Sequence, residues 1–244
     1  MFFKLVSFLL GCSIGSFLNV VVYRLPNKMN LSFPGSSCPL CNNKIKWYDN
    51  IPILSFLILR GKCRKCKTKI SIKYPLIEFL TGVMFLLVYL KFDYSLETLK
   101  YFLFLSFLIS IAFIDLKNQY IPDRLNGLLL VSGILFSLIS INTLELSIIG
   151  SSVFSFPFLL IYGYSEAILK KEALGFGDVK LVAGIGSFLL YKGLYNVYIF
   201  ITLSFVIGAI VSLSLIRLKL KSRNDRIAFA PYIALSALIM MFIQ

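Results

Sequence analysis

The chain is a succession of long apolar runs separated by short polar segments. About eight runs can be traced, and they cover residues 2–23, 75–90, 99–114, 125–141, 146–165, 179–190, 194–216 and 227–243. A helix needs about 20 apolar residues, and at least about 17, to cross a bilayer. The pattern therefore predicts an all-α polytopic membrane protein with about eight transmembrane helices.

The sixth run, 179–190, is the weakest candidate for a membrane span. It is short, it contains Gly184 and Gly186, and Lys192 closes it. The alternative is a re-entrant or tilted segment, which the membrane tolerates only where it is buried against other helices. We expect a full span, and the buried segment stays open as the alternative.

Composition agrees with this class of protein and removes several kinds of active site. Of the 244 residues, 58% are hydrophobic and none is histidine, and the mean hydropathy is +0.86. These values lie outside the range of globular domains. The missing histidine excludes Ser-His-Asp and Cys-His catalysis and the His-Glu-x-x-His zinc proteases. Hydrolysis by this chain must use carboxylates, a lysine-assisted serine, or a metal held without imidazole.

The chain has a net charge of +14, and its basic residues are placed unevenly, in a pattern that indicates membrane topology. Of the 25 lysines and arginines, 11 lie between Arg24 and Lys73, and 21 fall on one side of the predicted membrane. Cytoplasmic loops carry such an excess of positive charge. We therefore expect segment 24–74 to be cytoplasmic and both chain ends to lie outside. Some of these residues should contact anionic membrane lipid, and no nucleic-acid partner is expected.

Two C-x-x-C pairs lie in the polar segment after the first run. They are Cys38 with Cys41 and Cys63 with Cys66, separated by 21 residues. Thiolates at this spacing let two tight turns converge on a tetrahedral Zn²⁺, and a reducing cytoplasmic loop disfavours stable disulfides. We predict a structural zinc held by these four cysteines, with a redox pair as the alternative. The remaining Cys12 is interpreted as a small buried residue.

Two aspartates occupy positions where a carboxylate is costly. Asp115 ends the third run, near a predicted helix C-terminus whose dipole disfavours negative charge. Asp178 follows Gly175-x-Gly177 and precedes the sixth run. An ionisable side chain near a membrane often has a function. A residue in a locally unfavourable position with no structural benefit often belongs to a functional site. We predict that Asp115 and Asp178 face each other and share one reaction.

Two carboxylates held close together do not both ionise easily, so one keeps its proton as an acid while the other activates water. The water attacks a peptide carbonyl, and the protonated aspartate donates to the departing amine. The glycines before Asp178 permit unusual backbone angles and close approach by an extended peptide. The structural alternative is an N-cap role for Asp178, and an N-cap is the preferred interpretation for Asp123.

These motifs occur in a particular order over nearly the whole chain. The segments are Gly15–Pro26, both C-x-x-C pairs, Asp49–Pro52, Leu59–Cys63, Tyr74–Glu78, Ile114-Asp115, Ile121–Asp123 and Gly175–Leu181. Together they resemble the type IV prepilin peptidases, or prepilin leader peptidase/N-methyltransferases, a family of Gly-x-Gly-Asp intramembrane aspartic proteases. The resemblance implies a multi-pass enzyme of the bacterial inner membrane. It would cleave the basic leader of prepilins or pseudopilins at the cytoplasmic face and then methylate the new N-terminal amine with S-adenosylmethionine.

The resemblance also implies roles for particular residues. It assigns catalysis to Asp115 and Asp178, and zinc binding to the four loop cysteines. One departure is at Ala228 and Ala230, where the family usually has proline and glycine, and it removes no proposed catalytic group.

The site of methyl transfer is less clearly marked by the residues. The chain has no glycine-rich cofactor loop in a strand-to-helix setting. The amine must lose a proton before it attacks the methyl group, so a nearby carboxylate is expected. Asp49, Gly61 and Glu78, in or beside the cysteine loop, are the candidates for the S-adenosylmethionine site.

The predicted organisation has three parts: a first transmembrane helix at 1–23, a cytoplasmic cysteine-rich loop associated with methyl transfer at 24–74, and a transmembrane aspartic peptidase domain at 75–244. One alternative is a peptidase without methyl transfer, and another is a non-catalytic membrane scaffold for pilus assembly. A proton-relay transporter would place its carboxylates nearer the bilayer midplane. The choice of substrate among pilus, secretion and competence systems stays open.

Overall fold

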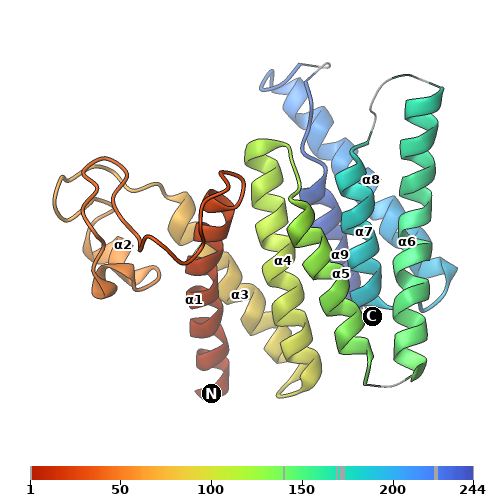
Figure 1. Cartoon of the computed structure of the whole chain (residues 1–244), viewed down its shortest axis with the longest axis horizontal. Helices are drawn as coiled ribbons and strands as arrows, with labels where there is room; N and C mark the ends of the chain where they lie inside the picture. The colour runs from red at the N-terminus through yellow and green to blue at the C-terminus, as the bar shows by residue number, and fades with distance from the viewer. Residues whose placement is uncertain (1, 140, 169, 171–173, 223–224, 244) are drawn as a thin grey trace. The chain divides into compact units, whose positions relative to one another are not determined.

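A computed structural model describes residues 2–139, 141–168, 170, 174–222 and 225–243. The regular elements in these ranges are all helices, and two isolated β-bridges lie in the cysteine loop. In chain order they are α1 (Phe2–Arg24), the 3-10 helix η1 (Trp47–Asn50), α2 (Leu54–Ile58), α3 (Lys73–Phe92), α4 (Leu96–Asn118), α5 (Asp123–Ser137), α6 (Ile141–Ala167), α7 (Phe176–Leu189), α8 (Leu194–Arg217) and α9 (Ala230–Ile243) (Figure 1).

Each predicted apolar run coincides with one of these helices, so the all-α class is confirmed. Five of them, α1, α3, α4, α6 and α8, are long and apolar enough to cross a membrane. By contrast α5, α7 and α9 have 15, 14 and 14 residues. At about 1.5 Å per residue these three helices reach only about 21–23 Å, short of the roughly 30 Å hydrocarbon core. A total of eight spans stays a prediction.

The chain forms two compact units, Met1–Ser110 and Ile111–Gln244, and the division falls inside α4. In the first unit, α1 and α3 pack closely along small residues. A Cβ added at Gly15 would lie only 2.8 Å from the Cα of Glu78. Asn19 of α1 donates a 3.1 Å hydrogen bond from Nδ2 to the carbonyl of Tyr74 in α3. Both features are typical of helix packing in membranes.

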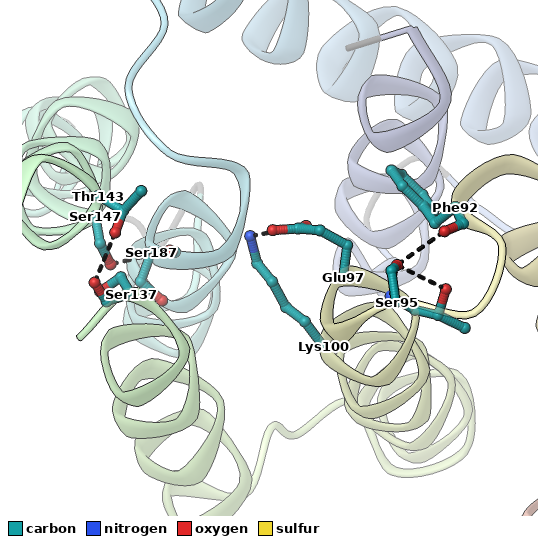
Figure 2. Close-up of polar contacts among 9 residues, drawn as sticks. Phe92, Ser95, Glu97, Lys100, Ser137, Thr143, Ser147 and Ser187 are labelled. Carbon is teal, nitrogen blue, oxygen red and sulfur yellow. Dashed lines mark hydrogen bonds and ion pairs between the residues drawn. The ribbon is translucent and has the colours of Figure 1, made fainter. Parts of the chain in front are cut away.

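The turn between α3 and α4 is held by short polar contacts (Figure 2). The Ser95 hydroxyl donates to the carbonyl of Phe92 at 2.8 Å. In the first turns of α4, the buried Lys100 forms an ion pair with Glu97 at 3.5 Å. A charged side chain inside an apolar helix is costly unless it is paired, and Glu97 supplies one such partner.

In the second unit, α7 is the central helix and packs against α5, α6 and α9 (Figure 1). Ten of its 14 residues are buried. A helix that is apolar on most sides is normally buried inside a protein. Because other helices enclose α7, it does not need the length of a helix that crosses a bilayer alone. Close packing depends on glycine, because a Cβ at Gly184 would lie 2.8 Å from the side chain of Leu129 in α5.

One end of α7 is tied to α6 by polar contacts. The buried Ser147 hydroxyl of α6 donates to the carbonyl of Ser187 at 3.0 Å, and Thr143 at the start of α6 donates to the carbonyl of Ser137 at the end of α5 (Figure 2). The three helices α5, α6 and α7 therefore form one packed group.

The contact between α6 and α7 generates a stability prediction. A Cβ at Gly186 would collide with the backbone carbonyl of Gly150 in α6, and backbone atoms cannot turn aside. We expect Gly186→Ala to destabilise the protein by about 1–3 kcal/mol, the usual cost of overpacking. The measurement is the temperature at which half of the detergent-purified protein leaves the monodisperse size-exclusion peak.

The matched control is Gly163→Ala, in α6, where an added Cβ meets no atom within 4 Å. Alanine has a higher helix propensity than glycine, so this variant should keep or slightly raise the midpoint temperature. An equal loss of stability in both variants would contradict a tight α6–α7 contact.

Candidate functional site

Asp115 lies in the last turn of α4, as expected, and only 6% of it is exposed. Its Oδ2 accepts a 3.0 Å hydrogen bond from the backbone N–H of Ala230, the first residue of α9. The backbone of Phe229 is a second hydrogen-bond partner. A helix N-terminus offers free N–H groups and the positive end of a dipole. The start of α9 therefore stabilises a charge that the end of α4 disfavours.

Asp178 is the third residue of α7, and 7% of it is exposed. The N-cap of α7 is Gly175, so an N-cap role for Asp178 is wrong. The carboxylate instead has the backbone of Gly175, the N-cap residue, as a hydrogen-bond partner. The acid of a capping box makes the same kind of bond to the N-cap residue of its helix. Its Oδ1 is buried and has no hydrogen-bond partner in the described ranges.

The two predicted aspartates belong to the same compact unit. The charge of Asp115 acts directly on the Asp178 carboxylate. Electrostatic interaction between two unit charges falls with distance and is strongest where water is excluded. Both buried carboxylates therefore lie in the same unit, close enough for their charges to interact. That the two face each other and share one reaction stays a prediction.

The first turns of α7 are held by the segment that opens α5. Asn126 Nδ2 donates to the carbonyl of Gly177 at 3.1 Å. Lys180 Nζ pairs with Asp123 Oδ1 at 2.7 Å, with both side chains exposed. Asp123 is the first residue of α5 rather than its N-cap, so that predicted role is wrong. Because exposed ion pairs contribute little stability, the Asn126 contact is the stronger restraint on the first turn of α7.

The two glycines before Asp178 permit close packing and not unusual backbone angles. Neither Gly175 nor Gly177 has a positive φ, and Gly175 has φ −75° and ψ 141°. A Cβ at Gly177 would lie 3.3 Å from the Cβ of Ile121. The expectation of unusual angles is therefore wrong. The residue that packs closely on Gly177 is Ile121, and close approach by an extended peptide stays a prediction.

Each C-x-x-C pair lies in a tight hairpin turn with the same hydrogen-bond pattern. The N–H of the first cysteine donates to the carbonyl five residues later, and its carbonyl accepts from the N–H four residues later. The bonds are Cys38 N–H to Asn43 O at 3.0 Å, Asn42 N–H to Cys38 O at 2.9 Å, Cys63 N–H to Thr68 O at 2.8 Å and Lys67 N–H to Cys63 O at 3.0 Å.

The second hairpin repeats the first in sequence as well as in structure. The pattern Cys-x-x-Cys-x-x-Lys-Ile occurs at 38–45 and again at 63–70. The cysteine spacing alone predicts four ligands, whereas the longer repeat predicts two equivalent turns. Two equivalent turns that face each other present four sulfur atoms to one point.

The four sulfur atoms fit a tetrahedral metal ion. They all lie within 4.8 Å of one another, and Cys38 Sγ is 3.7 Å from Cys66 Sγ. Zinc–sulfur bonds of about 2.3 Å in a tetrahedron separate the sulfurs by about 3.8 Å. All five cysteines of the chain are free, and the buried Cys12 lies apart from this group, as expected. The cluster of Cys38, Cys41, Cys63 and Cys66 can therefore hold a metal ion.

The three candidates for the methyl-donor site lie in the first unit, and each polar one has its own partner. Asp49 forms an ion pair with Arg64 at 2.6 Å, which lowers the pKa of Asp49. Glu78 is buried, and its Oε2 accepts a 2.7 Å hydrogen bond from the N–H of Ile53. Gly61 has φ 65°, a conformation that favours glycine. No hydrogen bond or ion pair among the described residues joins these three candidates.

Asn126 and the start of α9 were not singled out by the sequence pattern. Asn126 lies in an apolar run, where an amide must find a hydrogen-bond partner, and this signal was available. The contact of Ala230 carries no such signal, because every residue except proline has a backbone N–H. The same fact explains why alanine serves at this position, since the N–H alone reaches Asp115.

Comparison with known protein families covers both groups of candidate residues. Residues 9–92 match the Bacterial Peptidase A24 N-terminal domain, and residues 102–213 match the Type IV leader peptidase family. The first match contains the four loop cysteines, and the second contains Asp115 and Asp178. No solved structure matches the chain with significance.

Several curated relatives bear the name prepilin leader peptidase/N-methyltransferase. The protein of Neisseria gonorrhoeae is 36% identical over 94% of this chain and 87% of the relative. That of Aeromonas salmonicida (strain A449) is 35% identical over 98% and 90%, respectively. That of Myxococcus xanthus (strain DK1622) is 35% identical over 86% of this chain, which spans only 62% of that longer protein. This chain therefore belongs to the type IV leader peptidase family.

Proposed function

We propose that this protein cleaves the N-terminal leader of type IV prepilins or pseudopilins and then methylates the new N-terminal amine. The names of its relatives support both activities. The observation that carries the peptidase assignment is the pair Asp115 and Asp178. Both carboxylates are buried, come from different helices and interact through their charges.

In the proposed reaction, one aspartate takes a proton from water while the other holds a proton. The hydroxyl adds to the scissile carbonyl while the second aspartate gives its proton to the carbonyl oxygen, which yields a neutral tetrahedral gem-diol. The C–N bond then breaks as the first aspartate passes the proton from water to the leaving amine, and the second aspartate recovers a proton from a gem-diol hydroxyl. The unpartnered Oδ1 of Asp178 is free to accept a hydrogen bond from the water, and Asn126 keeps the adjoining backbone in place.

We place methyl transfer in the cysteine-rich loop, 24–74, with Asp49, Gly61 and Glu78 as candidates for the donor site. S-adenosylmethionine supplies a methyl group on a sulfonium, and the substrate amine must give up a proton before it attacks. A carboxylate beside the amine would take that proton. Asp49 and Glu78 are the carboxylates available, although their present partners give each a structural role as well.

We assign Zn²⁺ to the cluster of four cysteines. A Cys₄ set with these separations suits zinc, and no exchangeable position is left for catalysis. The ion would join the two hairpins. Lysines and arginines in the same loop would offset the negative charge of four thiolates.

We further propose a multi-pass arrangement in the bacterial inner membrane, with residues 24–74 and both aspartates at the cytoplasmic face. Residues 1–23 would form the first span, and residues 75–244 the peptidase domain. Five helices are long enough to cross, and 21 of the 25 basic residues fall on the proposed inner side. Prepilins and membrane lipid are the proposed partners, and nucleic acid is not.

The peptidase assignment predicts the effect of changing either carboxylate to an amide. Asp115→Asn and Asp178→Asn should each slow leader removal at least about 100-fold, the usual contribution of a general acid or base. Co-expression with each prepilin of the same genome, followed by mass spectrometry of the pilin, measures this. Asp93→Asn, the same carboxylate-to-amide change at the C-cap of α3, is the matched control. Full processing by either amide variant would refute the assignment.

The methyl-transfer assignment can be tested separately. Purified protein is incubated with labelled S-adenosylmethionine and a pilin peptide whose leader has already been removed. We expect wild type and Asp115→Asn to transfer label at similar rates, because the peptide no longer needs cleavage. Absence of transfer with intact leader cleavage would favour the peptidase-only alternative. A scaffold would show neither activity, and Asp115→Asn would leave pilus assembly intact.

The zinc assignment predicts a metal content of about one zinc per chain in protein purified without chelator. Cys63→Ser should lose most of that zinc, because three remaining thiolates hold it far less tightly. Elemental analysis of the monodisperse fraction measures the content. Cys12→Ala, outside the cluster, should retain it. Full zinc content in Cys63→Ser would contradict the proposed site.

A further inference from the structure

In the first unit, a hydrogen bond joins the cysteine loop to α3 beyond the first turn of that helix. The buried Glu78 accepts the N–H of Ile53 at 2.7 Å. Glu78 is the sixth residue of α3, about 7.5 Å along the helix from its start. Ile53 has φ 61° and ψ −51°, which a β-branched residue adopts only when its surroundings hold it there. The tie to Glu78 is such a restraint, and it fixes the start of α2.

Because α3 is a candidate membrane span, this tie fixes the depth of α2. A segment bound to the first turns of a membrane span cannot stand far from the bilayer. Figure 1 shows the same arrangement within the first unit, with α2 level with the half of α1 that ends at Arg24. The short helix α2 therefore lies near the boundary between lipid headgroups and acyl chains.

The side chains that α2 leaves uncovered are apolar. Leu57 is 63% exposed and Ile58 is 73% exposed, while Ser55 is buried and donates to the carbonyl of Tyr48. The neighbouring η1 packs against α2 and carries Trp47, which is 80% exposed. Leucine, isoleucine and tryptophan gathered in this way are typical of segments that lie in a membrane interface.

A basic pocket adjoins this apolar surface. It has a volume of about 310 Å³, and Ile58 and Leu59 form part of its wall. Its lining includes Cys63, one of the four clustered cysteines, together with four cations and no carboxylate: Arg60, Lys62, Arg64 and Lys67. Arg64 pairs with Asp49, whereas the other three have no ion pair among the described residues.

The charges and the apolar wall together identify the occupant. A pocket with this lining attracts an anion and repels a basic peptide. A free phosphate would leave Ile58 and the rest of α2 in water. The phosphate of an anionic lipid would meet the cations while its acyl chains cover the apolar side chains.

We propose that the cysteine loop docks on the membrane that anchors it, with α2 and Trp47 in the headgroup–acyl boundary and an anionic phospholipid headgroup in the pocket of Arg60, Lys62, Arg64 and Lys67. This docking is independent of whether the chain cleaves prepilins. It would hold the cysteine loop at the membrane depth at which the transmembrane helices begin.

The chain contains a single tryptophan, and Trp47 reports on this region directly. Its ring lies 5.6 Å from that of Tyr48, which in turn contacts the Arg64 guanidinium. The full-length protein is placed in nanodiscs of phosphatidylcholine with increasing brominated phosphatidylglycerol. We expect quenching of Trp47 that saturates with the anionic lipid, and weak quenching when the bromine is on phosphatidylcholine instead. No quenching by either lipid would overturn docking.

The pocket is tested by the triple variant Arg60→Gln/Lys62→Gln/Lys67→Gln. Each cation near an anionic surface changes lipid affinity about fivefold, so the mole fraction for half-quenching should rise at least about fivefold. Lys28→Gln/Lys44→Gln/Lys69→Gln removes the same charge from exposed loop positions outside the pocket, and it should shift this fraction much less. Equal shifts in the two variants would overturn the pocket assignment.

Two further measurements distinguish other occupants. Inorganic phosphate at millimolar concentration should leave the quenching of Trp47 unchanged. Loss of that quenching in phosphate would show that the pocket takes free phosphate instead. Leu57→Ser/Ile58→Ser should abolish quenching while the protein stays monodisperse. Retained quenching in that variant would overturn the placement of α2. Shielding of Trp47 only after a second protein is added would identify a protein partner and overturn the lipid assignment.

Discussion

The second unit depends on how it accommodates carboxylates among apolar helices. Asp115 is buried at the negative end of α4, where its charge is opposed by the helix dipole. The N-terminus of α9 supplies the compensating donors, through the N–H of Ala230 at 3.0 Å and the backbone of Phe229. Two helices with their ends opposed in this way create a site that neither could form alone.

The second carboxylate is positioned by the packing of α7. This helix is enclosed by α5, α6 and α9 and is buried over most of its length. Its first turn carries Asp178, and Asn126 of α5 holds the backbone just before it. A short helix surrounded by protein fixes a side chain more firmly than a loop does. The glycines of α7 are what allow its neighbours to come so close.

The first unit is organised around different interactions. Its loop consists of two equivalent hairpins whose cysteines meet, so a metal ion can serve as the core that so short a segment lacks. Glu78 then binds the loop to α3 through a buried hydrogen bond. That contact ties a polar, basic segment to α3, and the apolar side chains of α2 stay uncovered. The proposed lipid docking follows from this placement.

Hydropathy alone predicted the helices, because each apolar run is a local property of the chain. Cysteine spacing predicted the four sulfur ligands for the same reason, since two turns suffice to bring each pair together. The candidates Asp115 and Asp178 could be named because a carboxylate beside an apolar run is conspicuous wherever the chain later carries it.

Contacts between distant segments were decided only by the tertiary structure. The sequence pattern assigned an N-cap role to Asp123 and left one open as the alternative for Asp178, whereas the N-cap residues are Pro122 and Gly175, and Asp123 pairs with Lys180. It did not indicate that α9 would reach Asp115, because that bond uses a backbone N–H common to nearly all residues. Side-chain patterns reveal which groups need partners, and only the folded chain determines which backbone groups meet that need.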